Sequence, residues 1–304
     1  ETQLTLNKMK SALFLILLFI QLSLLSQTRQ RWEQVVNWDG VSHWSRYMIT
    51  LPAFQGPNSL PVPQLGNGRV DSNSYIGVSG AFHYAKGDNT QNIIINGYLA
   101  VVKDVVGVEL TWIPWEHYKM STALKEKRHV YYEYFNDNKA AGDLILNTNF
   151  RLLRKWAPAV DLVFQLGYRM PSGTDYGSAR YSDGPGYHFA INMGKKLDKA
   201  GTLKLTAMAG FLVWQIESDI FKQDDSFLFG AGLEYHKKNF SIHSNIAGYL
   251  GYLENQGDKP VVFRTRIEQQ LKKMKLVIGM QEGLHDFDYS SFDAGLRFNF
   301  NQGK

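Results

Sequence analysis

The feature that most restricts the fold is a repeated alternation of side-chain polarity. Between residues 76 and 300, segments of about ten residues carry an apolar side chain at every second position. Successive side chains of an extended strand point to opposite faces, so a period of two predicts strands with one apolar and one polar face. Twelve such segments, an even number, occur at residues 76–84, 93–101, 106–112, 144–152, 160–168, 187–193, 203–213, 227–235, 240–252, 261–271, 276–280 and 292–300.

The composition agrees with a β protein and excludes several classes of function. Aromatic residues make up 13% of the chain and there are 27 glycines, while a mean hydropathy of -0.27 is too low for a bundle of membrane helices. The absence of cysteine excludes disulfides, thiolate metal sites and a cysteine nucleophile. The net charge of +5 comes from scattered basic residues, which predicts no nucleic-acid partner.

The lengths of the connections distinguish a membrane barrel from a soluble sandwich, which alternation alone does not. The second, fourth, sixth, eighth and tenth connections are tight, with "KD" at 103, "AP" at 157, "LDKAG" from 197, "HKKN" from 236 and "KKM" from 272. The others are mostly longer, with "KGDNT" from 86, residues 119–141, "PSGTDYGSARYSDGPG" from 171, "SDIFKQDD" from 218, "ENQGDK" from 254 and "HDFD" from 285. Short periplasmic turns and longer outer loops are typical of outer-membrane barrels. The sequence therefore predicts an all-β fold, a transmembrane antiparallel β-barrel of about twelve strands at residues 74–304.

The N-terminal part divides into two segments. Residues 1–26 read as an upstream overhang followed by a secretory signal peptide, because Met9 and Lys10 precede the short apolar stretch "SALFLILLFIQLSLLSQ". Residues 27–73 include "PAFQGPNSLPVPQLGNG", whose prolines disfavour a central strand. We interpret this part as a periplasmic lead or a plug of the barrel. A further strand over "SRYMITLPAF" is the alternative.

The C-terminal segment indicates a cellular location in addition to a strand. "DAGLRFNF" contains Asp293, Gly295, Phe298 and Phe300 in the pattern polar-x-Gly-x-x-aromatic-x-aromatic. This pattern resembles the C-terminal targeting strand of bacterial outer-membrane barrels, which their assembly machinery recognises. The resemblance implies a location in the bacterial outer membrane, with outer-membrane lipid and the barrel-assembly machinery as partners.

Three further segments carry a resemblance to a family. "QGPNSLPVP", "SARYSDGPGY" and "GYLENQGDKPVVFRTRIE" are similar to segments of a family of outer-membrane β-barrel proteins from Bacteroidota, and the similarity spans most of the chain. A more distant likeness, around "YRMPSG", is to the outer-membrane barrels linked to uptake of aromatic compounds. These resemblances imply the fold and the location, and no substrate is carried over from them.

The polar face of the predicted strands supplies the candidate site. Charged residues at lumen-facing positions form the predicted solute pathway: Glu109, Asp161, Arg169, Arg264, Arg266 and Glu268. The long third outer loop contains Asp175, Arg180 and Asp183 and is predicted to constrict the pore. The alternative for both groups is structural, an ionic core in the barrel and an exposed glycine-rich loop.

Metal and cofactor sites have little support in the sequence. Several outer-loop aspartates have oxygen ligands suited to Ca²⁺, namely Asp88, Asp137, Asp224, Asp225, Asp258, Asp286 and Asp288. No loop has the spacing of a recognised calcium motif, and no phosphate-binding or zinc-protease motif occurs. We therefore predict no cofactor and no metal.

The function predicted from these features is a channel or transporter for small solutes with a narrow polar lumen. The alternatives are a structural or adhesive barrel with a filled lumen and an outer-membrane lipid hydrolase. In "SIHSN" the potential base His243 and nucleophile Ser244 are adjacent, so a strand points them to opposite faces. We therefore predict that the protein is not an enzyme.

Overall fold

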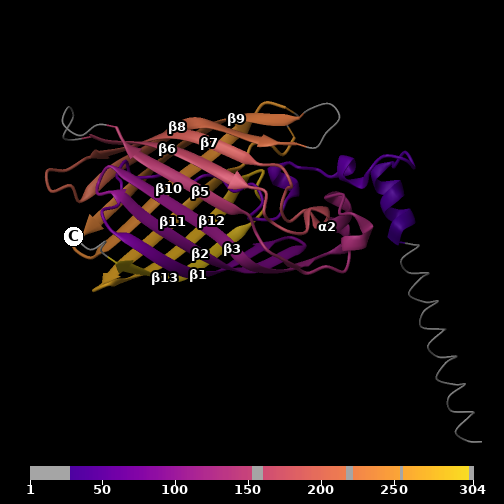
Figure 1. The fold of residues 1–304 in the computed structure, drawn as a ribbon, viewed down its shortest axis with the longest axis horizontal. Coiled ribbons are helices and arrows are strands. Elements are labelled where there is room, and N and C mark those ends of the chain that lie inside the picture. Colours follow the sequence, from indigo (N-terminus) through magenta and orange to yellow (C-terminus); the bar gives the residue numbers. More distant parts are fainter. Residues whose placement is uncertain (1–27, 153–159, 217–221, 254–255, 301–304) are drawn as a thin grey trace, which may run out of the picture.

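The computed structural model of the chain describes residues 28–152, 160–216, 222–253 and 256–300. Twelve long antiparallel strands pair with their neighbours in sequence, and β1 (Ser74–Ala85) pairs with β13 (Ser290–Phe300) to close the barrel. The remaining long strands are β2 (Asp88–Val102), β3 (Val106–Met120), β5 (Leu144–Arg151), β6 (Val160–Met170), β7 (Gly186–Lys196), β8 (Leu203–Gln215), β9 (Gln223–Lys237), β10 (Phe240–Gly251), β11 (Val261–Leu271) and β12 (Met274–His285). The predicted fold class and all twelve predicted strands are confirmed (Figure 1).

Short elements lie between or before the strands. These are the 3-10 helices η1 (Trp44–Tyr47), η2 (Pro52–Phe54), η3 (Tyr132–Tyr134) and η4 (Tyr176–Ser178), the helix α2 (Thr122–Lys127) and the two-residue strand β4 (Lys139–Ala140) beside β3. Residues 28–36 form a further helix. In the described parts of the chain, no helix has the length and apolar character needed to cross a membrane.

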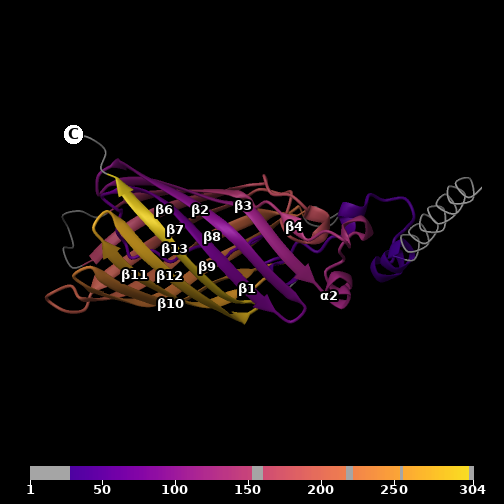
Figure 2. The same ribbon diagram turned by 90° about the horizontal axis from the view of Figure 1, so that it is seen from below.

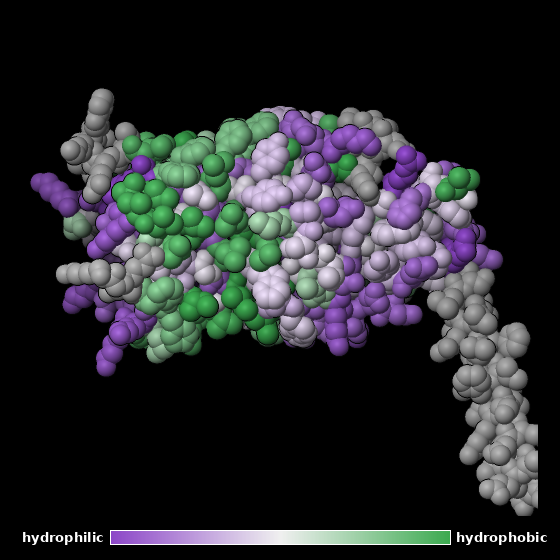
Figure 3. Space-filling model, in the orientation of Figure 1, coloured by the Kyte–Doolittle hydropathy of each residue, from purple (hydrophilic) through white to green (hydrophobic). Residues whose placement is uncertain are grey.

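The alternation of side chains gives the barrel an apolar outside. On β13, Phe292, Leu296 and Phe298 are exposed, whereas the alternate positions Asp293 and Arg297 point to the lumen and are partly buried. On the face seen in Figure 3, the apolar residues form a band across the part of the barrel nearer the chain's C-terminal end, and a paler, more polar region follows towards the opposite end. A continuous apolar belt with polar residues on both sides is typical of a β-barrel in a lipid bilayer.

The two rims differ as the connection lengths predict, with one correction. The connections around Asp104, Lys238 and Lys272 are tight turns at the rim where β13 ends, here called the short-turn end. The opposite rim, here called the long-loop end, bears α2 and the loops that join β3 to β5 and β6 to β7 (Figure 2). The first outer connection was predicted to be the loop "KGDNT", and this is wrong. Asp88, Asn89 and Thr90 belong to β2 and pair with β1, so the turn consists of Lys86 and Gly87. The turn "AP" lies outside the described residues.

Residues 48–71, here called the lumen segment, run through the inside of the barrel. They begin at the long-loop end beside the helix at residues 28–36 and reach the short-turn end, where β1 starts. Along this path the segment contacts strands from all sides of the barrel, and Leu60, Val62 and Leu65 belong to the main buried cluster with side chains from β7 to β11. The alternative of a further strand over residues 45–54 is wrong, because η1 and η2 occupy that stretch.

The C-terminal pattern lies on the strand that closes the sheet. Phe298 and Phe300 face outwards, while the backbone of Gly295 lies so close to Ser79 of β1 that an added Cβ would come within 2.4 Å of the Ser79 side chain. The signal-peptide prediction and residues 301–304 fall outside the described residues. The predicted interaction of this strand with the assembly machinery stays a prediction.

Candidate solute pathway in the lumen

Near the long-loop end, the lumen segment is held by single side chains from the wall. The indole nitrogen of Trp214 on β8 donates to the carbonyl oxygen of Thr50 at 3.1 Å. The hydroxyl of Tyr249 on β10 donates to the carbonyl oxygen of Leu60 at 2.9 Å. Both aromatic side chains are buried, so these bonds are shielded from water and also satisfy two carbonyl groups of an irregular backbone.

Arg264 anchors the middle of the segment. Its guanidinium donates to the carbonyl oxygens of Val62 at 2.7 Å and Pro63 at 3.1 Å and to the side-chain oxygen of Gln281 at 2.6 Å. A guanidinium presents its N–H donors in one fixed plane. It can therefore bind the two consecutive backbone carbonyls on one side and the Gln281 side-chain amide on the other. Arg264 thus lies on the predicted lumen face, and its polar head is engaged by the lumen segment.

Close packing against β6 and β7 holds the segment near the short-turn end. The Gly66 amide donates to the Asn192 side chain at 2.8 Å, and Arg69 forms an ion pair with Asp161 at 2.7 Å. Gly68 has a φ of +76°, and a Cβ there would lie 2.4 Å from the carbonyl oxygen of Asp161. Only glycine fits both this conformation and this approach.

A polar cavity of about 850 Å³ lies between the lumen segment and the wall. Its lining includes Asp104 and Gly201, which lie in turns, and Lys196, the last residue of β7, so the cavity extends to the short-turn end. Charged side chains of both signs face it: Arg69, Asp71, Glu109, Arg151, Asp161, Lys204, Glu234, Arg266, Glu268, Lys275 and Arg297. The strands thus form a wide, strongly polar vestibule at this end.

Four of the six predicted pathway residues line this cavity. Asp161 binds Arg69, Arg151 and Lys204 at 2.7, 3.3 and 3.1 Å. The other three are Glu109, which accepts from the Tyr75 hydroxyl at 3.1 Å, Glu268, which pairs with Lys275 and Arg297 at 2.8 and 3.3 Å, and Arg266. The structure brings these four residues together at one cavity.

The other two predicted residues lie farther towards the long-loop end. Arg169 and Arg264 line a second cavity of about 340 Å³, beside residues 57–64 of the lumen segment. Arg169 forms an ion pair with Asp143 at 2.6 Å and donates to the carbonyl oxygen of Gly184 at 2.8 Å. Glu109, Arg266 and Arg297 line both cavities, so the cavities adjoin at these residues.

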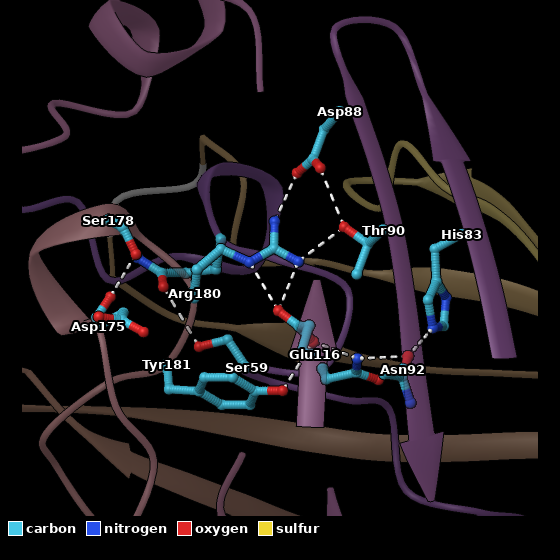
Figure 4. A network of polar contacts seen from close by, with 12 residues as sticks. Ser59, His83, Asp88, Thr90, Asn92, Glu116, Asp175, Ser178, Arg180 and Tyr181 are labelled. Atoms are coloured by element: carbon cyan, nitrogen blue, oxygen red, sulfur yellow. Dashed lines mark hydrogen bonds and ion pairs between the residues drawn. The ribbon is translucent and has the colours of Figure 1, made fainter. Parts of the chain in front are cut away.

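A buried ionic network occupies the long-loop end (Figure 4). Arg180 is fully buried and forms ion pairs with Asp88 and Glu116, each at 2.7 Å, while Tyr181 donates to the second oxygen of Glu116 at 2.8 Å. Arg128 also binds Asp88, at 2.8 Å. Burial alone would lower the pKa of Arg180, but the Glu116 and Asp88 carboxylates raise it well above its ordinary value, so the guanidinium stays charged.

The network also fixes the predicted constriction loop inside the barrel. Asp175 and Ala179 flank η4 with left-handed backbone conformations, and this bend directs Arg180 inwards. The guanidinium of Arg180 lies against the lumen segment, where a Cβ on Gly56 would come within 2.8 Å of its central carbon. Asp183 follows in the same loop and is exposed. Of the three predicted loop residues, Arg180 meets the lumen segment through its contact with Gly56.

The sequence reasoning missed the partners of Arg180. From the sequence, Asp88 was named as a possible calcium ligand, and Glu116, Arg128 and Tyr181 were given no role. Asp88 and Glu116 lie at the ends of β2 and β3, beyond the apolar positions, and point inwards. The signal of Asp88 in the sequence is that it continues the polar face of β2 past its apolar part. Glu116 has the parity of the apolar positions Leu110 and Trp112, and it points inwards because the pairing of β3 shifts by one residue between Trp112 and Trp115, which a period of two does not predict.

His243 and Ser244 have separate partners. His243 contacts the Thr206 hydroxyl at 3.0 Å, and the Ser244 hydroxyl contacts that of Thr265 at 3.0 Å. The two side chains therefore have no hydrogen bond to each other through which a base would activate a nucleophile.

Comparisons with known proteins identify the fold. No family model and no curated protein matches the sequence. An outer-membrane channel from Pseudomonas putida F1 is similar in structure, with a TM-score of 0.54 and 14% identity over 80% of this chain and 97% of that one. The NanC porin has a TM-score of 0.50 and 9% identity over 74% of this chain and 100% of the porin. The chain has the fold of these outer-membrane barrels, and an origin in Bacteroidota stays a prediction.

Proposed function

We propose that the protein is a channel of the bacterial outer membrane for small polar solutes, and that the lumen segment holds it closed in the arrangement described above. The observation that carries this proposal is the charged cavity of about 850 Å³ at the short-turn end. Charged groups lining a wide vestibule keep it hydrated and attract ionic or polar solutes. A barrel with a packed structural core does not require such a hydrated, charged cavity.

The orientation follows from the rims. Short turns face the periplasm in outer-membrane barrels, and longer loops face outwards. The polar vestibule would then open to the periplasm, and the network around Arg180 would lie at the outer mouth. The two structurally similar proteins reported above are described as a channel and a porin, which supports a barrel channel in general.

A segment that closes a channel must be able to move. The lumen segment has no strand pairing with the wall. Wall side chains such as Trp214, Tyr249 and Arg264 bond to its carbonyl groups, and Asn58 and Arg69 of the segment bind Glu116 and Asp161. Two backbone bonds, from Ala53 and Gly56 to connecting loops, and apolar packing add to these contacts. The conformational entropy of an ordered irregular segment opposes these contacts. Displacement of the segment would join the two cavities along Glu109, Arg266 and Arg297.

An engineered disulfide tests whether the segment closes the pore. A Cβ on Gly66 would lie 3.4 Å from the Asn192 Cβ, close to the range of about 3.5–4.5 Å found in disulfides. Because the natural chain has no cysteine, the double variant Gly66→Cys/Asn192→Cys can form one intramolecular bond. In planar bilayers we expect single-channel currents under reducing conditions and loss of these currents after oxidation. Each single-cysteine variant serves as a control and should conduct in both conditions.

The second candidate is a structural or adhesive barrel, favoured by the filled long-loop end. It predicts no current from the reduced double variant, from the natural protein, or from a chain without the lumen segment. That result would disprove the channel proposal. Equal currents in the oxidised and reduced forms would instead show that solutes pass beside an immobile segment.

A further inference from the structure

Two buried carboxylates at the long-loop end face each other without a counter-charge. Asp224 is the second residue of β9, and Asp258 lies in the connection between β10 and β11. Both residues are 0% exposed. Within the described residues, no hydrogen bond reaches Asp224 Oδ2 or either side-chain oxygen of Asp258, and no ion pair includes either residue.

The orphaned oxygens converge on one small space beside Gly251, the last residue of β10. A Cβ built on Gly251 would lie 2.5 Å from Asp258 Oδ2 and 2.8 Å from Asp224 Oδ2. The absence of a side chain at Gly251 therefore leaves this space to the carboxylates. The other oxygen of Asp224 accepts from the Tyr252 amide at 3.2 Å, which fixes the direction in which Oδ2 points.

Two carboxylates in such a place are stable only if a bound cation or a shared proton neutralises their charge. Burying an ionised carboxylate without a partner is very costly, and a second carboxylate nearby adds repulsion. An unsatisfied buried polar group in a native structure often marks an ion or water that is bound there. Carboxylate oxygens are the preferred ligands of calcium, which accepts irregular and flexible coordination.

We propose that Asp224 and Asp258 bind a calcium ion at the long-loop end of the barrel. The two aspartates supply both charged ligands, because no group of three or more acidic, histidine or cysteine side chains suited to a metal occurs in the described residues and no third carboxylate joins them. Main-chain carbonyls and water complete the six to eight oxygens that calcium takes. With two charged ligands, we expect an affinity of about 10⁻⁴–10⁻³ M, the range of extracellular calcium modules.

The position of the ion gives it a structural consequence. The carbonyl oxygen of Asp258 accepts from the Gly251 amide at 3.0 Å, and that of the preceding Gly257 accepts from the amide of Ala53 at 3.0 Å. The same short connection thus reaches β10 on one side and the start of the lumen segment on the other. A bound calcium ion would tie this connection to β9 and hold the entry of the lumen segment in place.

Calcium titration of the complete folded protein in detergent micelles, first stripped with EDTA, tests the site. We expect heat of binding with the affinity given above and a higher midpoint of thermal unfolding in CaCl₂ than in EDTA. Asp258→Asn should weaken calcium binding at least about tenfold and remove the shift of the midpoint. Asp225→Asn is the matched control, because Asp225 is adjacent in sequence but its Oδ1 accepts from Gln223, and it should bind calcium as the natural protein does.

Terbium luminescence locates the bound ion without a variant at the site. Trp214 lies opposite Asp224 in the register of β8 and β9, so excitation of tryptophan should sensitise Tb³⁺ bound there, and Ca²⁺ should compete. Trp214→Phe should reduce the luminescence and leave calcium binding intact. The proposal is overturned if the natural protein shows neither calcium heat nor a shifted midpoint. It is also overturned if lowering the pH without calcium raises the midpoint of thermal unfolding while calcium does not. The two carboxyl groups would then share a proton instead of binding an ion.

Discussion

At the scale of single residues, Arg180 shows how the long-loop end is sealed. One guanidinium contacts carboxylates from two strands, Asp88 and Glu116, and also donates to the Thr90 hydroxyl at 2.8 Å. The planar fork of arginine makes several such bonds at once, which lysine does not. The buried acids of β2 and β3 therefore hold the constriction loop inside the barrel, where Arg180 packs on the lumen segment.

Removal of this guanidinium should destabilise the fold strongly. Arg180→Met keeps much of the volume but leaves Glu116 buried without a cation, and breaking a buried pair in this way costs about 3–5 kcal/mol. Arg31→Met is the control, because Arg31 pairs with Glu126 at 2.9 Å with 63% of its side chain exposed, and exposed pairs contribute at most about 1 kcal/mol. Denaturant unfolding of the refolded proteins measures both changes, and equal losses in the two variants would contradict the role assigned to Arg180.

At the scale of elements, the strands follow from the sequence more completely than their connections. A period of two marks the apolar part of each strand because lipid outside and polar groups inside act on each one, although a bulge between Trp112 and Trp115 interrupts it in β3. The first outer connection was predicted wrongly because β1 and β2 extend beyond the apolar belt. Asn89 and Thr90 belong to this extension of β2, and as polar residues they do not show the apolar alternation that marks a strand. Arg180 lies in the long loop that the sequence analysis names, but its partners Asp88 and Glu116 are 92 and 64 residues away in sequence, and no local pattern encodes such a pairing.

The lumen segment illustrates the same limit. Its prolines exclude a central strand, so the sequence separates it from the barrel. Its position depends instead on contacts with distant wall residues, such as Arg264 with Val62 and Tyr249 with Leu60. Because the segment is irregular and has no periodicity, its sequence contains no pattern from which these contacts can be predicted.

Removal of the segment should open the channel. A chain without residues 28–71 keeps all strands from β1 to β13, so the barrel can still close, and water replaces Leu60, Val62 and Leu65 in the lumen. We expect a larger and more steady single-channel conductance than that of the natural protein, with a similar content of β structure by circular dichroism. A folded truncated barrel whose conductance is unchanged would show that the segment does not obstruct the path.

At the scale of the whole molecule, the apolar belt determines how the barrel sits in a bilayer. The belt covers the part of the barrel nearer the short-turn end, and the strands continue beyond it towards the long loops (Figure 3). The structure thus divides into a part that contacts lipid and a part that projects from it. The ionic network of Arg180 lies at the end of the barrel that bears the long loops.

A charge placed in the belt should reveal its depth. Val78 of β1 is 48% exposed on the lipid-facing side, opposite Leu296 of β13, and Val78→Arg should cost about 2–4 kcal/mol if it lies near the bilayer midplane. Val41 is 89% exposed in the part of the chain before the lumen segment, and Val41→Arg should change the unfolding free energy little. Denaturant titration in lipid vesicles checks both values. Equal effects of the two substitutions would place the belt elsewhere.

The path of residues 48–71 has a consequence for how the molecule is made. The helix at residues 28–36 lies at one end of the barrel, β1 starts at the other, and the chain between them passes through the ring that β1 and β13 complete. The helix at residues 28–36 and η1, which carry Trp32 and Trp44, are too bulky to be drawn through a finished pore of packed side chains. We therefore expect β1 and β13 to pair last in folding, after the lumen segment already lies inside the barrel.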